Sequence, residues 1–188
     1  MLRNRENSYG LVAIALHWTI AGLFLCQIAL GLTLDRVTSM ALQFTLIQWH
    51  KSLGFLILLL SLLRLAWRLV NRGPREPASL GKAEILAARG VQSLLYILLI
   101  AVPLAGWALV STSTLNIPSF AFNLLVVPDL PLARSDAAEA FWRQVHTLLA
   151  YTAAAVAAGH IIAALRHQFW LRDGILSRMI FPARRPTR

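Results

Sequence analysis

The chain has 188 residues, of which 57% are hydrophobic and only 14% are charged. Soluble domains average about 45–50% apolar and about 25% charged residues, so this composition excludes a disordered chain and argues against a soluble domain. The single cysteine, Cys26, excludes a disulfide scaffold. The formal net charge of +10 would suggest a nucleic-acid partner in a soluble protein, so the positions of the charges decide its meaning.

Four apolar segments follow one another along the chain. A transmembrane helix needs about 20 mostly apolar residues. Segments 11–34, 91–110 and 144–165 contain no Asp, Glu, Lys or Arg. The remaining segment contains Arg64 and Arg68 near its end, where long side chains can reach the lipid headgroups.

We therefore predict an all-α membrane protein, a bundle of four transmembrane helices that forms a single domain over residues 1–188. The predicted helices cover about residues 11–34, 50–70, 90–111 and 141–167. Residues 71–89 and 111–143 are predicted to be linkers, because they contain proline and charged residues of both signs.

The basic residues predict the orientation of the bundle. With the N-terminus inside, the inside regions hold 14 of the 18 Lys and Arg residues. By the positive-inside rule, both termini are then cytoplasmic, and the net charge needs no nucleic acid to explain it. The inside residues are Arg3, Arg5, Arg64, Arg68, Arg72, Arg75, Lys82, Arg89, Arg166, Arg172, Arg178, Arg184, Arg185 and Arg188. The outside loops hold Arg36, Lys51, Arg134 and Arg143.

Histidines are the informative polar residues within the apolar segments. His146 and His160 share the last predicted helix, 14 residues apart, which is about 21 Å of rise and close to four full turns. Both therefore project from nearly the same helix face. His17 lies near the depth of His160, and His50 lies near the depth of His146. The spacing thus predicts two pairs, one toward each side of the membrane.

Two histidines at one depth on different helices are what a haem iron requires, because it takes one imidazole on each face. Small residues beside the histidines of the last helix would let a flat macrocycle approach the backbone. These are Ala150, Ala153, Ala154, Ala157 and Gly159. The pattern favours haem, but alanine-rich faces also pack membrane helices. Intramembrane histidines also carry protons, so a haem-free transporter is the alternative from a different class.

At this point the chain resembles the bacterial cytochrome b561 family, in order and over nearly its whole length. The residues that carry the resemblance are Tyr9-Gly10, Ala15-Leu16-His17-Trp18, His50-Lys51-Ser52-Leu53-Gly54, Arg64, Trp67-Arg68, Leu95-Tyr96, Pro103, Gly106, His146, Gly159-His160, Arg166-His167, Arg172-Asp173 and Arg178-Met179. The resemblance implies a four-helix protein of the bacterial inner membrane with two non-covalent b haems. It also implies that His17, His50, His146 and His160 are the axial ligands of the haem irons.

One position departs from the family pattern. Many members have a further histidine early in the third helix, where this chain has Gln92. An amide is a poor iron ligand, so either that histidine is not an obligatory ligand or part of a haem site has been lost. The pairing by depth favours the first interpretation, because four histidines already fill four axial positions.

The two ends of the predicted electron path carry further candidates. Lys51 and Arg143 lie beside the outer histidines, where they could bind haem propionates or attract a small anion. His167 lies two helical turns beyond the inner histidine and is a candidate quinone-binding residue. None of these three is assigned a catalytic role by the sequence.

The resemblance implies electron exchange between a periplasmic one-electron donor and membrane quinone such as ubiquinone. Superoxide is one candidate donor, which would make the protein a superoxide:quinone oxidoreductase. The alternative is a cytochrome b membrane anchor that passes electrons between quinone and a partner redox protein. Neither interpretation predicts a nucleic-acid partner.

Overall fold

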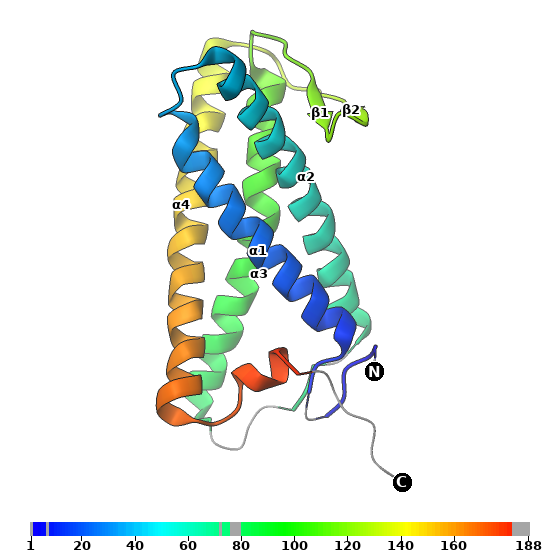
Figure 1. The fold of residues 1–188 in the computed structure, drawn as a ribbon, viewed down its shortest axis with the longest axis vertical. Coiled ribbons are helices and arrows are strands. Elements are labelled where there is room, and N and C mark those ends of the chain that lie inside the picture. Colours follow the sequence, from blue (N-terminus) through cyan, green and yellow to red (C-terminus); the bar gives the residue numbers. More distant parts are fainter. Residues whose placement is uncertain (1, 7, 72, 76–79, 182–188) are drawn as a thin grey trace.

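In the computed structural model, which describes residues 2–6, 8–71, 73–75 and 80–181, the chain is dominated by four long helices. They are α1 (Leu11–Leu34), α2 (Met40–Val70), α3 (Lys82–Thr112) and α4 (Asp136–Arg166). A short antiparallel hairpin of β1 (Ser119–Ala121) and β2 (Leu125–Val127) connects α3 to α4 (Figure 1). After α4 come a π-helical turn, η1 (His167–Leu171), and a 3₁₀ turn, η2 (Leu176–Met179).

All four helices are long and apolar enough to span a membrane, which confirms the predicted fold class. The start of α1 and the end of α4 lie at one end of the bundle, which we call the inner end (Figure 1). The opposite end, with the hairpin, is the outer end. Which side of the membrane each end faces stays a prediction. Of the predicted inside residues, Arg72, Arg184, Arg185 and Arg188 lie outside the described part of the chain.

Three of the four helices begin earlier than predicted, and α3 begins at Lys82 rather than at about residue 90. The helix α1 has the bounds of its apolar segment, but α2 begins at Met40 and α4 at Asp136. The side chains of Ser39 and Ser135 cap these two helices by accepting backbone N–H groups. A helix of 31 residues rises about 46 Å, more than the about 30 Å of hydrocarbon in a bilayer. Counting apolar residues predicts the part in lipid, so it misses these extensions.

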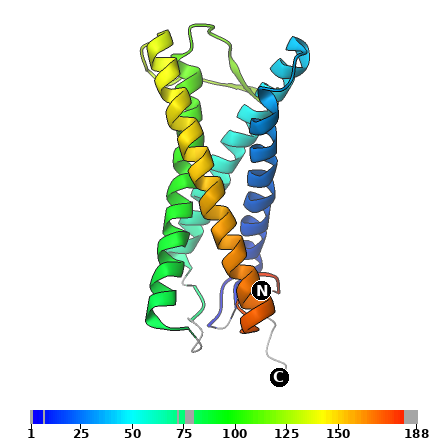
Figure 2. The ribbon, with the colours of Figure 1, turned by 90° about the vertical axis from the view of Figure 1, so that its left-hand side faces the viewer.

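The four helices form two closely packed pairs, α1 with α2 and α3 with α4. Figure 2 shows the pairs diverging toward the outer end. Few apolar side chains are buried in the described part of the chain, namely Ile14, Ile20, Ile57, Leu98, Ala105, Ala108 and Ala153. Leucines are instead exposed along the helices, as expected where lipid rather than water surrounds the bundle.

The hairpin is fixed to α2 by two buried polar side chains. The Gln48 amide donates to the carbonyl of Pro118 at 3.2 Å and accepts from the Phe120 N–H at 3.3 Å. The Ser52 hydroxyl lies 2.8 Å from the carbonyl oxygen of Phe120 and accepts from the Phe122 N–H at 2.9 Å. These hydrogen bonds pair backbone N–H and carbonyl groups of the hairpin, and they hold the hairpin against the outer half of α2.

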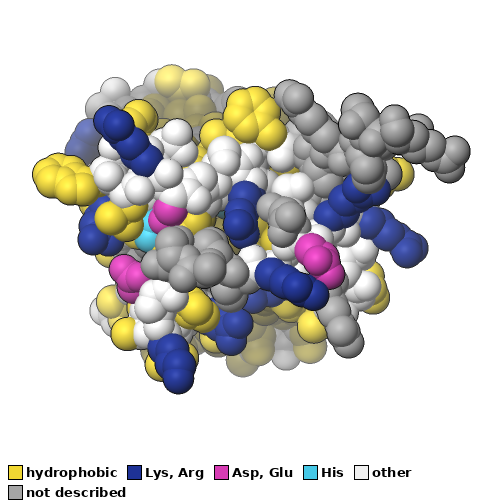
Figure 3. Space-filling view, turned by 90° about the horizontal axis from the view of Figure 1, so that it is seen from below, with side chains coloured by type: hydrophobic (Ala, Val, Ile, Leu, Met, Phe, Trp, Pro, Cys, Tyr) yellow, Lys and Arg dark blue, Asp and Glu magenta, His cyan; other side chains and the backbone are white. Residues whose placement is uncertain are grey.

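The inner end is closed by contacts between segments that are distant in sequence. The Trp18 indole donates to the carbonyl of Met179 at 2.8 Å, and the Arg178 guanidinium donates to the carbonyl of Arg75 at 2.9 Å. Arg75 in turn pairs with Glu6 at 3.1 Å. Figure 3 views this end directly and shows Lys and Arg side chains spread across it, with few acidic side chains between them.

We expect the Ser52→Ala variant to lower the free energy of unfolding by about 1 kcal/mol, because it removes the hydroxyl that accepts the Phe122 N–H and contacts the Phe120 carbonyl. Thr45→Ala is the matched control, since the Thr45 hydroxyl bonds only the Ala41 carbonyl of its own helix and is exposed. Thermal unfolding in detergent measures the difference. Equal melting temperatures for the two variants would show that Ser52 does not anchor the hairpin.

Candidate functional site

The structure brings the four intramembrane histidines together in the two predicted pairs. The ring centroids of His17 and His160 lie 6.4 Å apart, with their planes at 81°. Those of His50 and His146 lie 6.1 Å apart, also at 81°. Each pair joins α4 to one helix of the α1–α2 pair, and α4 does not pack closely against either helix.

The pairing follows from the depths of the residues along their helices. His50 and His146 each lie ten residues from the outer end of their helix, and His17 and His160 each lie six residues from the inner end. The sequence placed His50 at the start of its helix, which is incorrect because α2 begins ten residues earlier. The match in depth survives because both helices begin earlier than predicted, α2 by ten residues and α4 by five, which leaves both histidines ten residues from the observed helix start.

The separation between the rings fits a metal ion that lies between them. A metal–imidazole bond of about 2 Å, with about 1 Å more to the ring centroid, places two centroids about 6 Å apart across one ion. The described residues contain no group of three or more His, Cys, Asp or Glu side chains that would hold a bare metal ion. Each pair therefore suits an iron whose other ligands come from a macrocycle, as in haem.

The ring of His146 is held by α3. Its Nδ1 lies 2.9 Å from the carbonyl oxygen of Val102, so a proton on Nδ1 leaves Nε2 free for a metal. Gly106 faces the same ring, and a Cβ there would lie 3.0 Å from Cε1 and 3.1 Å from Nδ1. The glycine is thus required by close approach of the ring.

The ring of His50 has a different environment, built by α1. The Gln27 amide donates to the backbone carbonyl of His50 at 2.9 Å. Gly31 lies under the ring, and a Cβ there would lie 3.6 Å from the ring carbon Cε1. Gln27 was not singled out by the sequence analysis. An amide in the middle of an otherwise apolar segment was the signal that could have found it.

The sequence analysis expected the Arg64 side chain to reach the lipid headgroups, but the structure turns it toward Tyr96 instead. Its Nε donates to the hydroxyl of Tyr96 at 3.0 Å, and its guanidinium lies 5.7 Å from the centroid of that ring. Its charge acts on both inner histidines, His17 and His160. Arg68 lies over the same tyrosine ring at 5.2 Å, but its side chain is exposed. A cation is therefore turned toward the inner pair.

The two outer cations have acidic partners. Arg143 pairs with Glu139 at 2.6 Å, one helical turn away, and its side chain is 63% exposed. Lys51 is half-buried, and its charge is attracted by Asp129. Asp129 also pairs with Arg134 at 2.7 Å. The outer mouth is consequently less positive than its basic residues alone suggest.

His167 lies at the junction of α4 and η1, with its ring largely buried. Its Nδ1 lies 2.5 Å from Oδ2 of Asp173, whose side chain is 8% exposed. The other carboxylate oxygen of Asp173 accepts the Ile175 N–H at 3.2 Å, so the carboxylate is fixed. The sequence named His167 but not this partner, because a bend in the chain brings Asp173 back to it.

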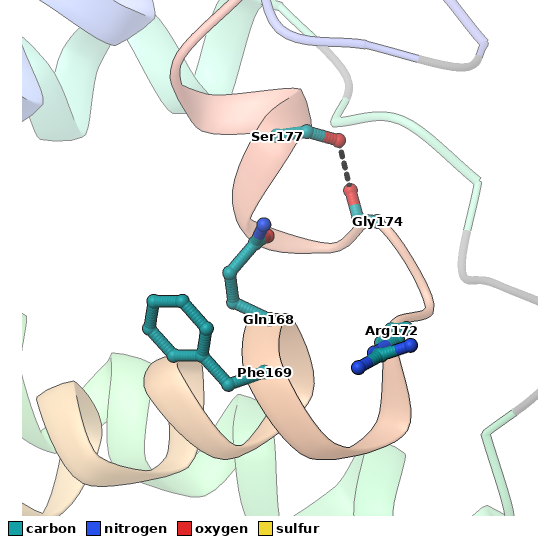
Figure 4. A pocket seen from close by; sticks show the side chains of 5 residues that line it. All are labelled: Gln168, Phe169, Arg172, Gly174 and Ser177. Carbon is teal, nitrogen blue, oxygen red and sulfur yellow. Dashed lines mark hydrogen bonds between the residues drawn. The ribbon is translucent and has the colours of Figure 1, made fainter.

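A hollow of about 400 Å³ lies beside η1, where the chain turns back toward the bundle. Figure 4 shows its lining, with Phe169 and Arg172 on the helical side and Ser177 opposite. The full lining is Gln168, Phe169, Arg172, Gly174 and Ser177.

Gln92, the residue that departs from the family pattern, is half-buried in α3 and belongs to neither histidine pair.

Comparison with known proteins gives a consistent result. A sequence profile of the family described as prokaryotic cytochrome b561 matches residues 8–182. The chain is 30% identical over 178 residues to cytochrome b561 homolog 2 of Escherichia coli K12, covering 94% of this chain and 93% of the relative. It is 28% identical over 183 residues to cytochrome b562 of Cereibacter sphaeroides, covering 95% and 98%.

We expect the Gly106→Ala variant to shift the ring of His146, because the added methyl group would lie 3.0 Å from Cε1, and to lower by at least half the absorbance of any haem that the outer pair binds. Gly90→Ala is the control, since it lies in the same helix with nothing within 4 Å of the added Cβ. Visible absorbance per protein measures both. If the two variants retained the same absorbance, the close approach of Gly106 to the ring would have no role.

Proposed function

The chain belongs to the prokaryotic cytochrome b561 family, and we propose that it carries electrons across a bacterial membrane through two b haems. Transmembrane electron transfer with haem b is the general activity that membership indicates. We assign one haem to His17 and His160 and the other to His50 and His146. The observation that carries this proposal is the presence of two imidazole pairs at bis-ligand separation, one near each end of the bundle.

A haem iron with two imidazole ligands has no open position, so the group supplies one-electron transfer rather than oxygen or substrate binding. The residues of the chain then hold and orient it. The bond from His146 Nδ1 to the Val102 carbonyl fixes the tautomer of that ligand. A b haem also brings carboxylates, which would add an acidic partner to the guanidinium of Arg64, whose Nε already donates to Tyr96 and which forms no salt bridge among the described residues.

At the inner end, we propose that His167 exchanges a proton with membrane quinone. A quinone takes up two electrons and two protons to become a quinol, so a proton donor is needed beside the electron path. Asp173 holds the ring of His167 through Nδ1 and leaves Nε2 available for the transfer. The position of His167, seven residues beyond the proposed inner ligand, places it between that haem and the membrane surface.

At the outer end, the donor is either a small anion such as superoxide or a partner redox protein. The acidic partners of Lys51 and Arg143 reduce the local positive charge that would attract an anion. The hairpin that Gln48 and Ser52 hold against the outer half of α2 also exposes Leu124 and Leu125, by 85% and 58%. These two observations favour the membrane-anchor alternative. Anaerobic reduction of the protein by superoxide, compared with reduction by quinols, distinguishes the superoxide donor from the partner redox protein.

We expect two non-covalent haems per chain, and we expect each histidine to act with its partner. His17→Ala and His160→Ala should each lose the same haem, about half of the total, and His50→Ala and His146→Ala should each lose the other. The pyridine haemochrome assay and redox titration measure the number and identity of the haems lost.

Gln92→Ala is the control for the histidine variants, because Gln92 belongs to neither pair. A Gln92→Ala protein that lost a haem as completely as a ligand variant would contradict the assignment. A colourless wild-type protein would contradict the haem proposal as a whole and would favour the haem-free transporter.

We expect His167→Ala to keep both haem spectra but to slow electron exchange with quinone by about 10²-fold, the contribution of a positioned proton donor. Asp173→Asn should slow it less, because the ring remains but its orientation is less constrained. Trp170→Ala in the same turn is the control, since its side chain is 85% exposed. Exchange at the parental rate in the His167→Ala protein would exclude His167 from the quinone reaction and leave the two-haem proposal intact.

A further inference from the structure

Two buried polar atoms at the outer pair have no hydrogen-bond partner among the described residues. One is Nδ1 of His50, and the other is Oε1 of Gln27. In a membrane interior, where no water is available, an unpaired donor or acceptor costs several kcal/mol, as an order of magnitude. The two atoms are complementary, because an imidazole Nδ1–H donates and an amide oxygen accepts.

The Gln27 side chain is already hydrogen-bonded to the backbone of His50. The Gln27 Nε2 group donates to the backbone carbonyl of His50 at 2.9 Å, which holds the amide against the residue that carries the unpaired ring nitrogen. The opposite ligand, His146, has its Nδ1 satisfied by the Val102 carbonyl. His50 is therefore the member of the outer pair whose ring orientation has no fixed acceptor.

Glycines border the Gln27 amide and the His50 ring. A Cβ at Gly54 would lie 3.4 Å from the Gln27 Nε2 atom, in van der Waals contact with the amide. Gly31, one turn beyond Gln27 on α1, leaves similar room beside the His50 ring. Two small residues thus enclose one polar contact between α1 and α2.

We propose that Gln27 is a positioning residue for the outer haem, whose Oε1 accepts the Nδ1–H of His50 when His50 binds the iron. This rests on the proposed function in one respect, that His50 is a haem ligand. An acceptor at Nδ1 fixes the tautomer and the ring plane, and it makes the imidazole a stronger electron donor. A stronger donor stabilises the ferric state, so Gln27 lowers the reduction potential of the outer haem.

The test compares Gln27→Leu with a matched control, Gln43→Leu. Gln43 also donates from an amide on one helix to a carbonyl at the α1–α2 junction, the Leu34 oxygen at 3.1 Å, but it lies away from both histidine pairs. We expect Gln27→Leu to raise the potential of the outer haem and to change its ferric electron-paramagnetic-resonance signal, which depends on the angle between the imidazole planes. The inner haem and the Gln43→Leu protein should match the parent.

A Gln27→Leu protein whose outer haem keeps the parental potential and resonance signal would overturn the proposal. If that variant does not retain the outer haem, Gln27→Glu decides, because a carboxyl group keeps the acceptor. The outer haem should then be retained, with a potential that is shifted in the direction opposite to the leucine effect or left at the parental value. Loss of the outer haem from Gln27→Glu would overturn the proposal, because an acceptor at this position would then not hold the ligand. A parent protein without haem would instead refute the proposed function.

Discussion

Everything that this chain is proposed to do depends on the distance that α4 keeps from α1 and α2. The helix is held by close packing on α3, on the other side, and it meets α1 and α2 mainly through imidazole rings. Had α4 packed against them as closely as α3 packs on α4, two facing rings could not enclose an ion. Ala153 on α4 is 1% exposed, so this helix contributes at least one of its small residues to the packed part of the bundle.

The parts of the site that the sequence predicted are those that depend on a single helix. A fixed rise per residue makes depth readable, so His146 and His160 could be placed at two levels and matched with His17 and His50. Both α2 and α4 begin earlier than predicted, and His50 and His146 still lie at one level. The fold class was predictable for a similar reason, because a bilayer imposes a minimum length on each apolar segment.

What the sequence did not show depends on how helices are rotated about their axes. Arg64 was assigned to the headgroups from its position in the chain, whereas the rotation of α2 turns it toward Tyr96. Gln27 contacts His50 only because α1 and α2 face each other at that level. The acidic partner of His167 lies six residues further along, beyond a left-handed residue, Arg172, whose conformation a local pattern does not reveal.

The placement of both His146 and His160 on α4 has a consequence for the biogenesis of the protein. Chains are made from the N-terminus, so α1, α2 and α3 enter the membrane before the last helix exists. Under the proposed ligation, neither cofactor can acquire its second axial bond until α4 has been inserted. Before then each haem has only one of its two histidines available, so completion of both ligand pairs is a late step in assembly.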